Sequence, residues 1–175
     1  MDQCELFAAL ARIILEAAKA DGRGDEKEVT GLLAECHHNQ SFAAIYTGSG
    51  GAMEHANAWL QILTDRTNKW DFDEDALAMA AAYNQIALCH IHRNDVQEAI
   101  ANWVTSLFYL EVPSAPKLSG VWPAINLALI YTIEKRLKEA DDVLALVLEE
   151  REKVLGRMTR LHPSKWMPLH SHGIV

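Results

Sequence analysis

The chain has 175 residues, a net charge of −8 and a hydrophobic content of 50%. It therefore holds enough apolar residues for a packed core, which a disordered chain lacks. Its negative charge excludes nucleic acid as an expected partner, because phosphate backbones repel an acidic chain.

The cysteines and the first residues indicate a cytoplasmic protein, with the nucleus as the alternative. The three cysteines are odd in number and lie at neither metal-site nor redox spacing, which is typical of a reducing compartment. The segment 1–18 starts with Asp2 and Glu5 instead of basic residues and has no clean cleavage site, so we expect no secretory signal. No apolar run approaches the ~20 residues that a membrane span needs, so we expect no membrane partner.

Helical spacing of apolar residues predicts three helices in the first part of the chain. The first covers 5–20 and ends at the glycine-containing turn 21–24. The second begins after Asp25, a suitable N-cap, and continues to Cys36 or beyond. Residues 46–52 form a flexible break, the third helix covers 53–64, and 65–73 is interpreted as a polar linker. The expected buried stripes of the second and third helices consist of Val29, Leu32 and Leu33, and of Ala56, Leu60 and Leu63.

Two helix pairs are predicted in the second part of the chain. The first pair consists of helices over 74–93 and 95–110, joined at Asn94-Asp95. Residues 112–120 form a Pro- and Ser-containing connection, and the second pair covers 121–134 and 137–155. The acidic run at 71–75 is interpreted as a helix start, where the helix dipole favours negative charge.

The two pairs repeat with an offset of 41 residues when Ala99 is aligned with Ala140. Other aligned positions are Ile86 with Leu127, Ala87 with Ala128, His90 with Tyr131, and Trp103 with Leu144. A fixed period of helical hairpins indicates an α-solenoid. Small residues at the aligned alanines let two antiparallel helices approach closely where they cross, and larger residues fill the space between hairpins.

This pattern resembles the tetratricopeptide (TPR) repeat, in its longer kinesin-light-chain variety over VLEEREKVLGRMTRLHP (147–163). It is also similar to a group of fungal intracellular TPR proteins. The resemblance implies an all-α solenoid of antiparallel hairpins, with TPR-like hairpins at 74–110 and 119–155. We expect two degenerate hairpins at 4–67 and an irregular tail at 156–175. Two residues depart from the repeat: His90 stands where an aromatic is usual, and Lys135 stands at a turn position usually held by Gly.

The resemblance also implies a concave groove, lined by the first helix of each hairpin, that binds a protein or peptide ligand. Amide side chains there can hold a peptide backbone, because they donate and accept hydrogen bonds at once. The alternative is that the asparagines tie adjacent hairpins together. The candidate groove residues are Asn84, Gln85, Leu88, His92, Asn126, Leu129 and Ile133.

Neither metal binding nor catalysis is expected. His90 and His92 lie two residues apart on a helix and point to different faces, so they do not converge as metal ligands. Cys36 adjoins His37 and His38, but adjacency in sequence does not make a nucleophile–base pair. We therefore expect no cofactor and no enzymatic activity.

The predicted function is protein–protein interaction, as a scaffold, adaptor or regulatory subunit. The alternatives are a truncated piece of a larger TPR regulator with a structural role, and a helical enzyme. After His162-Pro163 the repeat pattern would start another hairpin, but the chain continues as SKWMPLHSHGIV. The last hairpin is therefore expected to be covered by the tail through Trp166 and Met167, by a partner, or by a second copy in a homodimer.

Overall fold

The computed structural model describes residues 3–69, 72–111 and 120–155. Within these ranges the chain forms helices and no strand, which confirms the all-α prediction. The seven helices are α1 (Gln3–Ala20), α2 (Glu26–Thr47), α3 (Ala52–Lys69), α4 (Phe72–His92), α5 (Val96–Tyr109), α6 (Val121–Ile133) and α7 (Leu137–Leu155).

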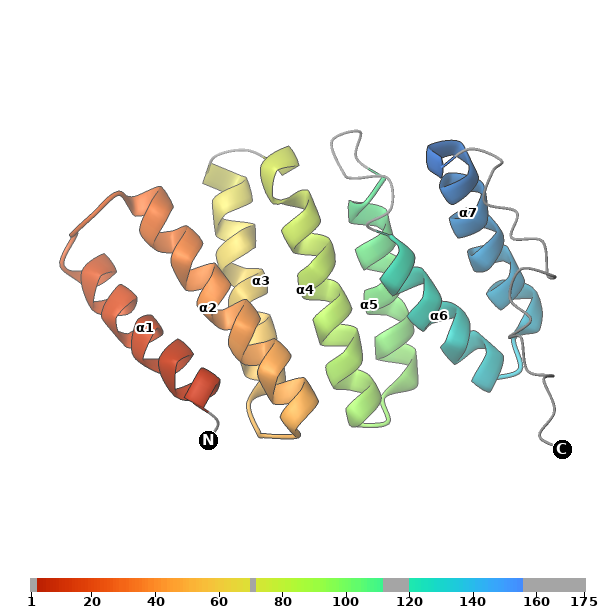
Figure 1. The fold of residues 1–175 in the computed structure, drawn as a ribbon, viewed down its shortest axis with the longest axis horizontal. Helices are drawn as coiled ribbons and strands as arrows, with labels where there is room; N and C mark the ends of the chain where they lie inside the picture. The colour runs from red at the N-terminus through yellow and green to blue at the C-terminus, as the bar shows by residue number, and fades with distance from the viewer. Residues whose placement is uncertain (1–2, 70–71, 112–119, 156–175) are drawn as a thin grey trace, which may run out of the picture.

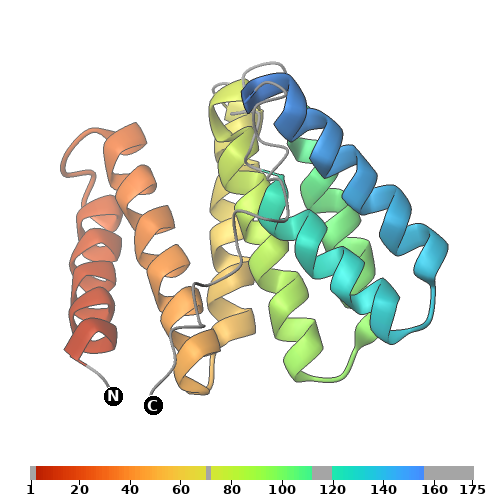
Figure 2. The same ribbon diagram turned by 45° about the vertical axis from the view of Figure 1, so that its right-hand side comes forward.

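The helices form an elongated array in which each one packs against the next along the chain. Figure 1 shows α1 and α7 at the two ends, and α2, α4 and α6 on the side toward the viewer. The turned view in Figure 2 shows the same order, with α7 at the outer edge. In addition, α2 contacts α4, so that helices of successive pairs touch across the array.

Local sequence explains most of the helix bounds. Asp25 has extended backbone angles, and its carboxylate accepts a hydrogen bond from the Glu28 amide at 3.1 Å, so it is the predicted N-cap of α2. The C-terminal four helices begin and end within two residues of their predicted positions. The acidic residues 73–75 lie in the first turn of α4, as the dipole argument predicted.

Two predictions about the first part of the chain are wrong. Residues 65–73 are not a linker, because α3 continues to Lys69 and α4 starts at Phe72. Two full hairpins over 4–67 would need four helices, whereas the structure has three between Gln3 and Lys69. There α2 and α3 form one pair, and α1 packs against α2 as an additional helix.

The core consists of two clusters along the array. The first contains the aligned alanines of both C-terminal hairpins, which are all buried as predicted. Trp103 is the largest side chain in that cluster and is 2% exposed. The second cluster joins α2, α3 and the first half of α4 through Ala34, Trp59, Leu63, Met79 and Ala82.

A buried ion pair ties α3 to α4. The Arg66 guanidinium Nη2 lies 3.2 Å from Asp75 Oδ1, and both side chains are largely buried. Gly31 of α2 makes room for this arginine, since a Cβ at Gly31 would lie 3.3 Å from Arg66 Nη1. A glycine inside a helix, which otherwise costs about 1 kcal/mol relative to Ala, is explained here by the close approach of that side chain.

The two C-terminal hairpins turn in the same way. Asn94 has φ 62° and Lys135 has φ 61°, and the two residues are 41 positions apart, as the repeat predicts. In both turns the next amide bonds back to the equivalent carbonyl: Asp95 to His90 at 2.9 Å, and Arg136 to Tyr131 at 2.8 Å. Lysine tolerates this left-handed conformation less well than asparagine or glycine.

Replacing Lys135 with Gly is therefore expected to raise the free energy of unfolding by about 1 kcal/mol. Lys135→Asn, which places the residue type of the Asn94 turn at this position, is expected to raise the free energy of unfolding by part of that amount. Urea denaturation of both variants measures the effect. Lys138→Gly, in the first turn of α7, serves as the control and should give no gain. Equal changes at both lysines would contradict the strain explanation.

Candidate functional site

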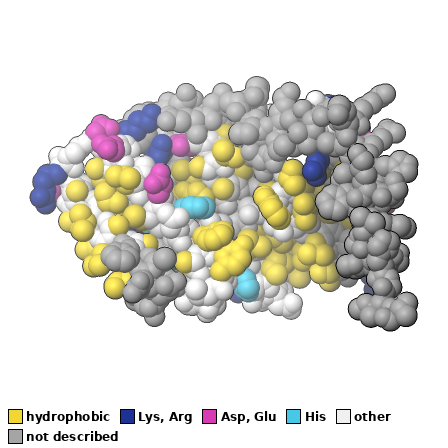
Figure 3. All heavy atoms as spheres, viewed as in Figure 1, with side chains coloured by type: hydrophobic (Ala, Val, Ile, Leu, Met, Phe, Trp, Pro, Cys, Tyr) yellow, Lys and Arg dark blue, Asp and Glu magenta, His cyan; other side chains and the backbone are white. Residues whose placement is uncertain are grey.

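The side of the array formed by α2, α4 and α6 exposes a large set of apolar side chains. On α6, Trp122, Ile125, Leu129 and Ile133 follow one another at spacings of three and four residues, so they lie on one helix face. Their exposed fractions run from 40% for Ile125 to 72% for Trp122. Figure 3 shows hydrophobic side chains spread over this side, with few charged groups among them.

Equivalent positions on α4 continue the same surface. The residues 41 positions before this α6 stripe are Ala81, Asn84, Leu88 and His92, and all four are at least partly exposed. On α2 the outward stripe includes Leu32, Phe42 and Tyr46, which are exposed, and the rings of the last two lie 4.5 Å apart. We call the surface formed by these stripes of α2, α4 and α6 the apolar face.

Asn84 and Asn126 join neighbouring helices. Asn84 Oδ1 accepts a hydrogen bond from Trp103 Nε1 at 2.9 Å and a second from Asn126 Nδ2 at 3.3 Å. These bonds connect α4, α5 and α6, so this amide oxygen is engaged within the protein. The geometry matches the alternative interpretation, in which the asparagines tie adjacent hairpins together.

Gln85 lies away from the apolar face, contrary to its assignment to the groove. It is 4% exposed, and its Nε2 lies 3.0 Å from His38 Nδ1 on α2. The His38 ring in turn packs edge-on against Trp59 of α3, with the ring centres 4.4 Å apart. Burial lowers the pKa of His38, although nearby Glu35 opposes the shift, so a neutral imidazole is favoured at this junction of three helices.

A second histidine contact connects α2 to α3. The Nδ1 atoms of His37 and His55 lie 3.2 Å apart, so one ring donates a hydrogen bond and the other accepts it. Burial is the main cause that lowers the pKa of both histidines, and Arg12 of α1 lowers both further. Protonating both rings would place two positive N–H groups against each other, so the contact requires at least one neutral ring.

Acidification is therefore expected to destabilise the first part of the array. Because the folded-state pKa of each of these three histidines is below its ordinary value of 6.5, the unfolded chain binds more protons as the pH falls below that value. We expect a nearly constant melting temperature above pH 7 and a decrease of several degrees by pH 5.5, measured by circular dichroism. The double variant His37→Gln/His55→Gln should reduce the decrease, whereas His92→Gln at an exposed site should not.

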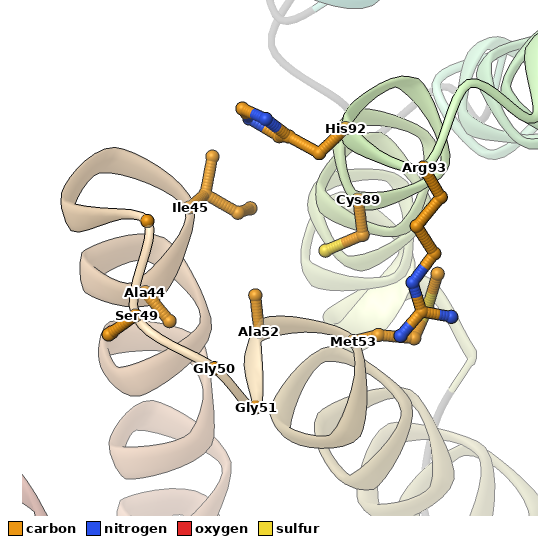
Figure 4. A pocket seen from close by; sticks show the side chains of 11 residues that line it. Ala44, Ile45, Ser49, Gly50, Gly51, Ala52, Met53, Cys89, His92 and Arg93 are labelled. Carbon is orange, nitrogen blue, oxygen red and sulfur yellow. The ribbon is translucent and has the colours of Figure 1, made fainter.

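A hollow of about 250 Å³ lies where the α2–α3 turn meets the end of α4. Figure 4 shows the backbone of Gly50 and Gly51 along one side, with Cys89 and His92 of α4 and Arg93, which follows α4, on the other. Burial raises the pKa of the Cys89 thiol, despite the opposing charge of Arg93, so a neutral thiol is favoured and a thiolate nucleophile is not. The hollow can accept a small apolar side chain next to a cationic rim.

The sequence did not predict the hollow or the histidine pair. His92 was assigned to the groove; it belongs to the α4 stripe of the apolar face and also lines the hollow. Residues 46–52 were predicted to be a break, but the α4 residues that line the hollow with them are about 40 positions away. The only available signal was the loss of the hydrophobic stripe at that break, which does not identify the helix that closes over it.

Other candidate chemistry is limited in the described parts of the chain. There, no three His, Cys, Asp or Glu side chains gather in a way that could hold a metal ion. Burial raises the pKa of the Cys36 thiol as well. Among the described helices, none is long and apolar enough to cross a membrane. The histidines at 162, 170 and 172, and Trp166, lie outside the described residues.

Comparisons with models of protein families, with curated proteins and with solved structures find no match for this chain.

Proposed function

We propose that this chain is a protein-interaction module of the TPR type, which binds a peptide or helix of another protein along its apolar face. The observation that carries the proposal is the α6 stripe of Trp122, Ile125, Leu129 and Ile133. Four large apolar side chains in a row are costly to leave in water, and contiguous exposed patches of this kind are typical of binding surfaces. Exposed tryptophans are frequent binding hot spots.

The repeat supports the assignment to the TPR type. The two C-terminal hairpins share buried alanines at the helix crossings and left-handed turns at the same repeat position. Their first helices, α4 and α6, contribute adjacent stripes to the apolar face. Repeat arrays of helical hairpins present extended surfaces of this kind.

The chemistry of the face defines the ligand class. Apolar side chains at spacings of three and four residues match the apolar stripe of an amphipathic helix. The chain carries a net charge of −8, so Lys and Arg beside that stripe would speed association and orient the ligand. We therefore expect the partner to present an amphipathic segment with apolar anchors and basic flanks.

Selection from a library of displayed peptides of about 20 residues, roughly 30 Å as a helix, tests this function. Peptides enriched on the full chain are synthesised, and their dissociation constants are measured by fluorescence anisotropy. Trp122→Ala and Leu129→Glu are each expected to weaken binding at least about tenfold, which corresponds to ~1.4 kcal/mol.

Val104→Glu is the matched control, because Val104 is similarly exposed but lies on α5, outside the apolar face. It should leave the dissociation constants unchanged. Equal losses for face and control variants, or enrichment of peptides without apolar anchors, would contradict the proposal. Circular dichroism of each variant verifies that the helices are retained.

A further inference from the structure

The outer side of α1, at the first end of the array, exposes a continuous apolar stripe. Four exposed apolar residues follow one another there at spacings of four, three and four, and therefore share one side of the helix: Leu6, Leu10, Ile13 and Ala17. Ile14 adjoins the stripe and is 67% exposed. In Figures 1 and 2, α2 lies on the inner side of α1, and no described helix lies on its outer side. We call the surface formed by these five residues the α1 face.

The rest of the array shows how an equivalent surface is covered. The contact of α1 with α2 corresponds to the contacts of α3 with α4 and of α5 with α6. However, α3 also packs against α2, and α5 against α4, and a short turn makes each of these pairs antiparallel. The α1 face is therefore on the side that, in α3 and α5, packs against an antiparallel helix. We expect it to be covered by an apolar helix in the same orientation.

The spacing of the stripe makes it complementary to a second copy of itself. The order four, three, four is the same in both directions, so two antiparallel α1 helices related by a twofold axis align their stripes. In this register Leu10 is opposite Ile13 of the second copy at the centre of the contact. Toward each end Leu6 is opposite Ala17, so that a large side chain meets a small one, as close helix packing requires.

Charge favours this end of the array for self-association. The helix α1 has two acidic and two basic residues, a net charge of zero, although the whole chain carries −8. Of these, Arg12 and Glu16 pair with each other at 2.8 Å. At the other end, α7 has six acidic and three basic residues, a net charge of −3, so two copies would repel each other there. Two copies can therefore approach through α1 without that repulsion.

We propose that two copies of this chain associate through their α1 faces, as an antiparallel pair of helices about a twofold axis. With 18 residues, α1 is about 27 Å long and roughly 10 Å wide, so the contact is smaller than the ~800 Å² that each partner contributes to a standard interface. We therefore expect a dimer that dissociates at micromolar concentrations. The proposal does not depend on the ligand of the apolar face, because α1 is not part of that face.

Sedimentation of the full chain at concentrations from about 1 μM to about 1 mM tests this inference. The average mass should rise from that of one chain, 19.5 kDa, towards twice that value. Leu10→Gln/Ile13→Gln should raise the dissociation constant of the dimer at least about tenfold. Leu146→Gln/Leu148→Gln is the matched control, since these leucines are 65% and 60% exposed on α7, and it should leave the dissociation constant unchanged. Circular dichroism verifies that each variant keeps its helices.

A pair of charge variants tests the antiparallel register. Leu6→Lys and Ala17→Glu should each weaken the dimer, because each places a charge opposite an apolar side chain. An equimolar mixture of the two variants should regain dimers, since the new lysine of one copy is then opposite the new glutamate of the other. In a parallel pair these two positions lie at opposite ends of the contact, so a mixture no heavier than its components would overturn the antiparallel arrangement.

Two other results would overturn the inference as a whole. One is a chain that remains monomeric up to about 1 mM. The other is a dimer that persists in Leu10→Gln/Ile13→Gln but is lost in Leu129→Glu, because the two copies would then meet through the apolar face instead of the α1 face.

Discussion

Trp103→Ala is expected to lower the free energy of unfolding by about 3–5 kcal/mol, the range found for large buried aromatic residues. Trp103 is 2% exposed at the centre of the cluster shared by α4, α5 and α6, and its removal leaves a cavity among the alanines at the helix crossings. The substitution also removes the hydrogen bond from Trp103 Nε1 to Asn84 Oδ1. Urea denaturation followed by circular dichroism measures the change.

Trp103→Phe separates packing from the hydrogen bond, since it retains an aromatic ring but has no donor. The free energy of unfolding should therefore decrease distinctly less for Trp103→Phe than for Trp103→Ala. Trp122→Ala provides the comparison at an exposed tryptophan, where the cost should stay below about 0.5 kcal/mol. A similar loss for the two alanine variants would contradict the assigned core.

Arg66→Met is the second change for which we expect a large effect, a loss of about 3–5 kcal/mol. Asp75 is 5% exposed, and its carboxylate would lose the guanidinium that lies 3.2 Å away. A buried carboxylate that loses its ion-pair partner is costly because it remains removed from water while the main charge that compensated for this is gone. The melting temperature at neutral pH and the urea midpoint should both fall.

The double variant Arg66→Met/Asp75→Leu tests the cause. The double variant removes the buried carboxylate together with the guanidinium. It should therefore recover most of the lost stability, because replacing both members of a buried ion pair with apolar residues is often tolerated. Exposed Arg23, which pairs with Asp21 in the α1–α2 turn, gives the control, and Arg23→Met should cost little. A double variant as unstable as Arg66→Met would contradict the ion-pair explanation.

The C-terminal half of the fold could be predicted from the sequence because it repeats. Two hairpins with aligned alanines constrain each other, and even the backbone conformation of Lys135 followed from its place in the repeat. The N-terminal half has no such internal comparison. The charged and polar residues between Asp65 and Lys69 were interpreted as a linker, yet they form the last turn of α3, with Arg66 turned inward to Asp75.

The candidate site was predictable to a lesser extent. Leu129, Ile133 and His92 are exposed on or beside the apolar face. Asn84 and Gln85 are adjacent in sequence, but neighbouring helix positions differ by about 100° in direction, so one lies at the α4–α6 junction and the other faces α2. Spacing alone does not fix the rotation of a helix about its axis. Trp122 and Ile125 are exposed on the same face but were not among the predicted groove residues.

The helix α4 belongs to both core clusters, and this has a consequence for how the molecule comes apart. Met79 and Ala82, in the first half of α4, pack with α2 and α3, while Ala87, Leu88 and Ile91, in the second half, pack with α5 and α6. The helices at either end can therefore unfold while the other cluster stays folded. Because α4 is the helix that the two clusters share, it determines how cooperatively the whole array unfolds. A ligand lying along the apolar face from α2 to α6 would bridge both clusters and make the array unfold as a single unit.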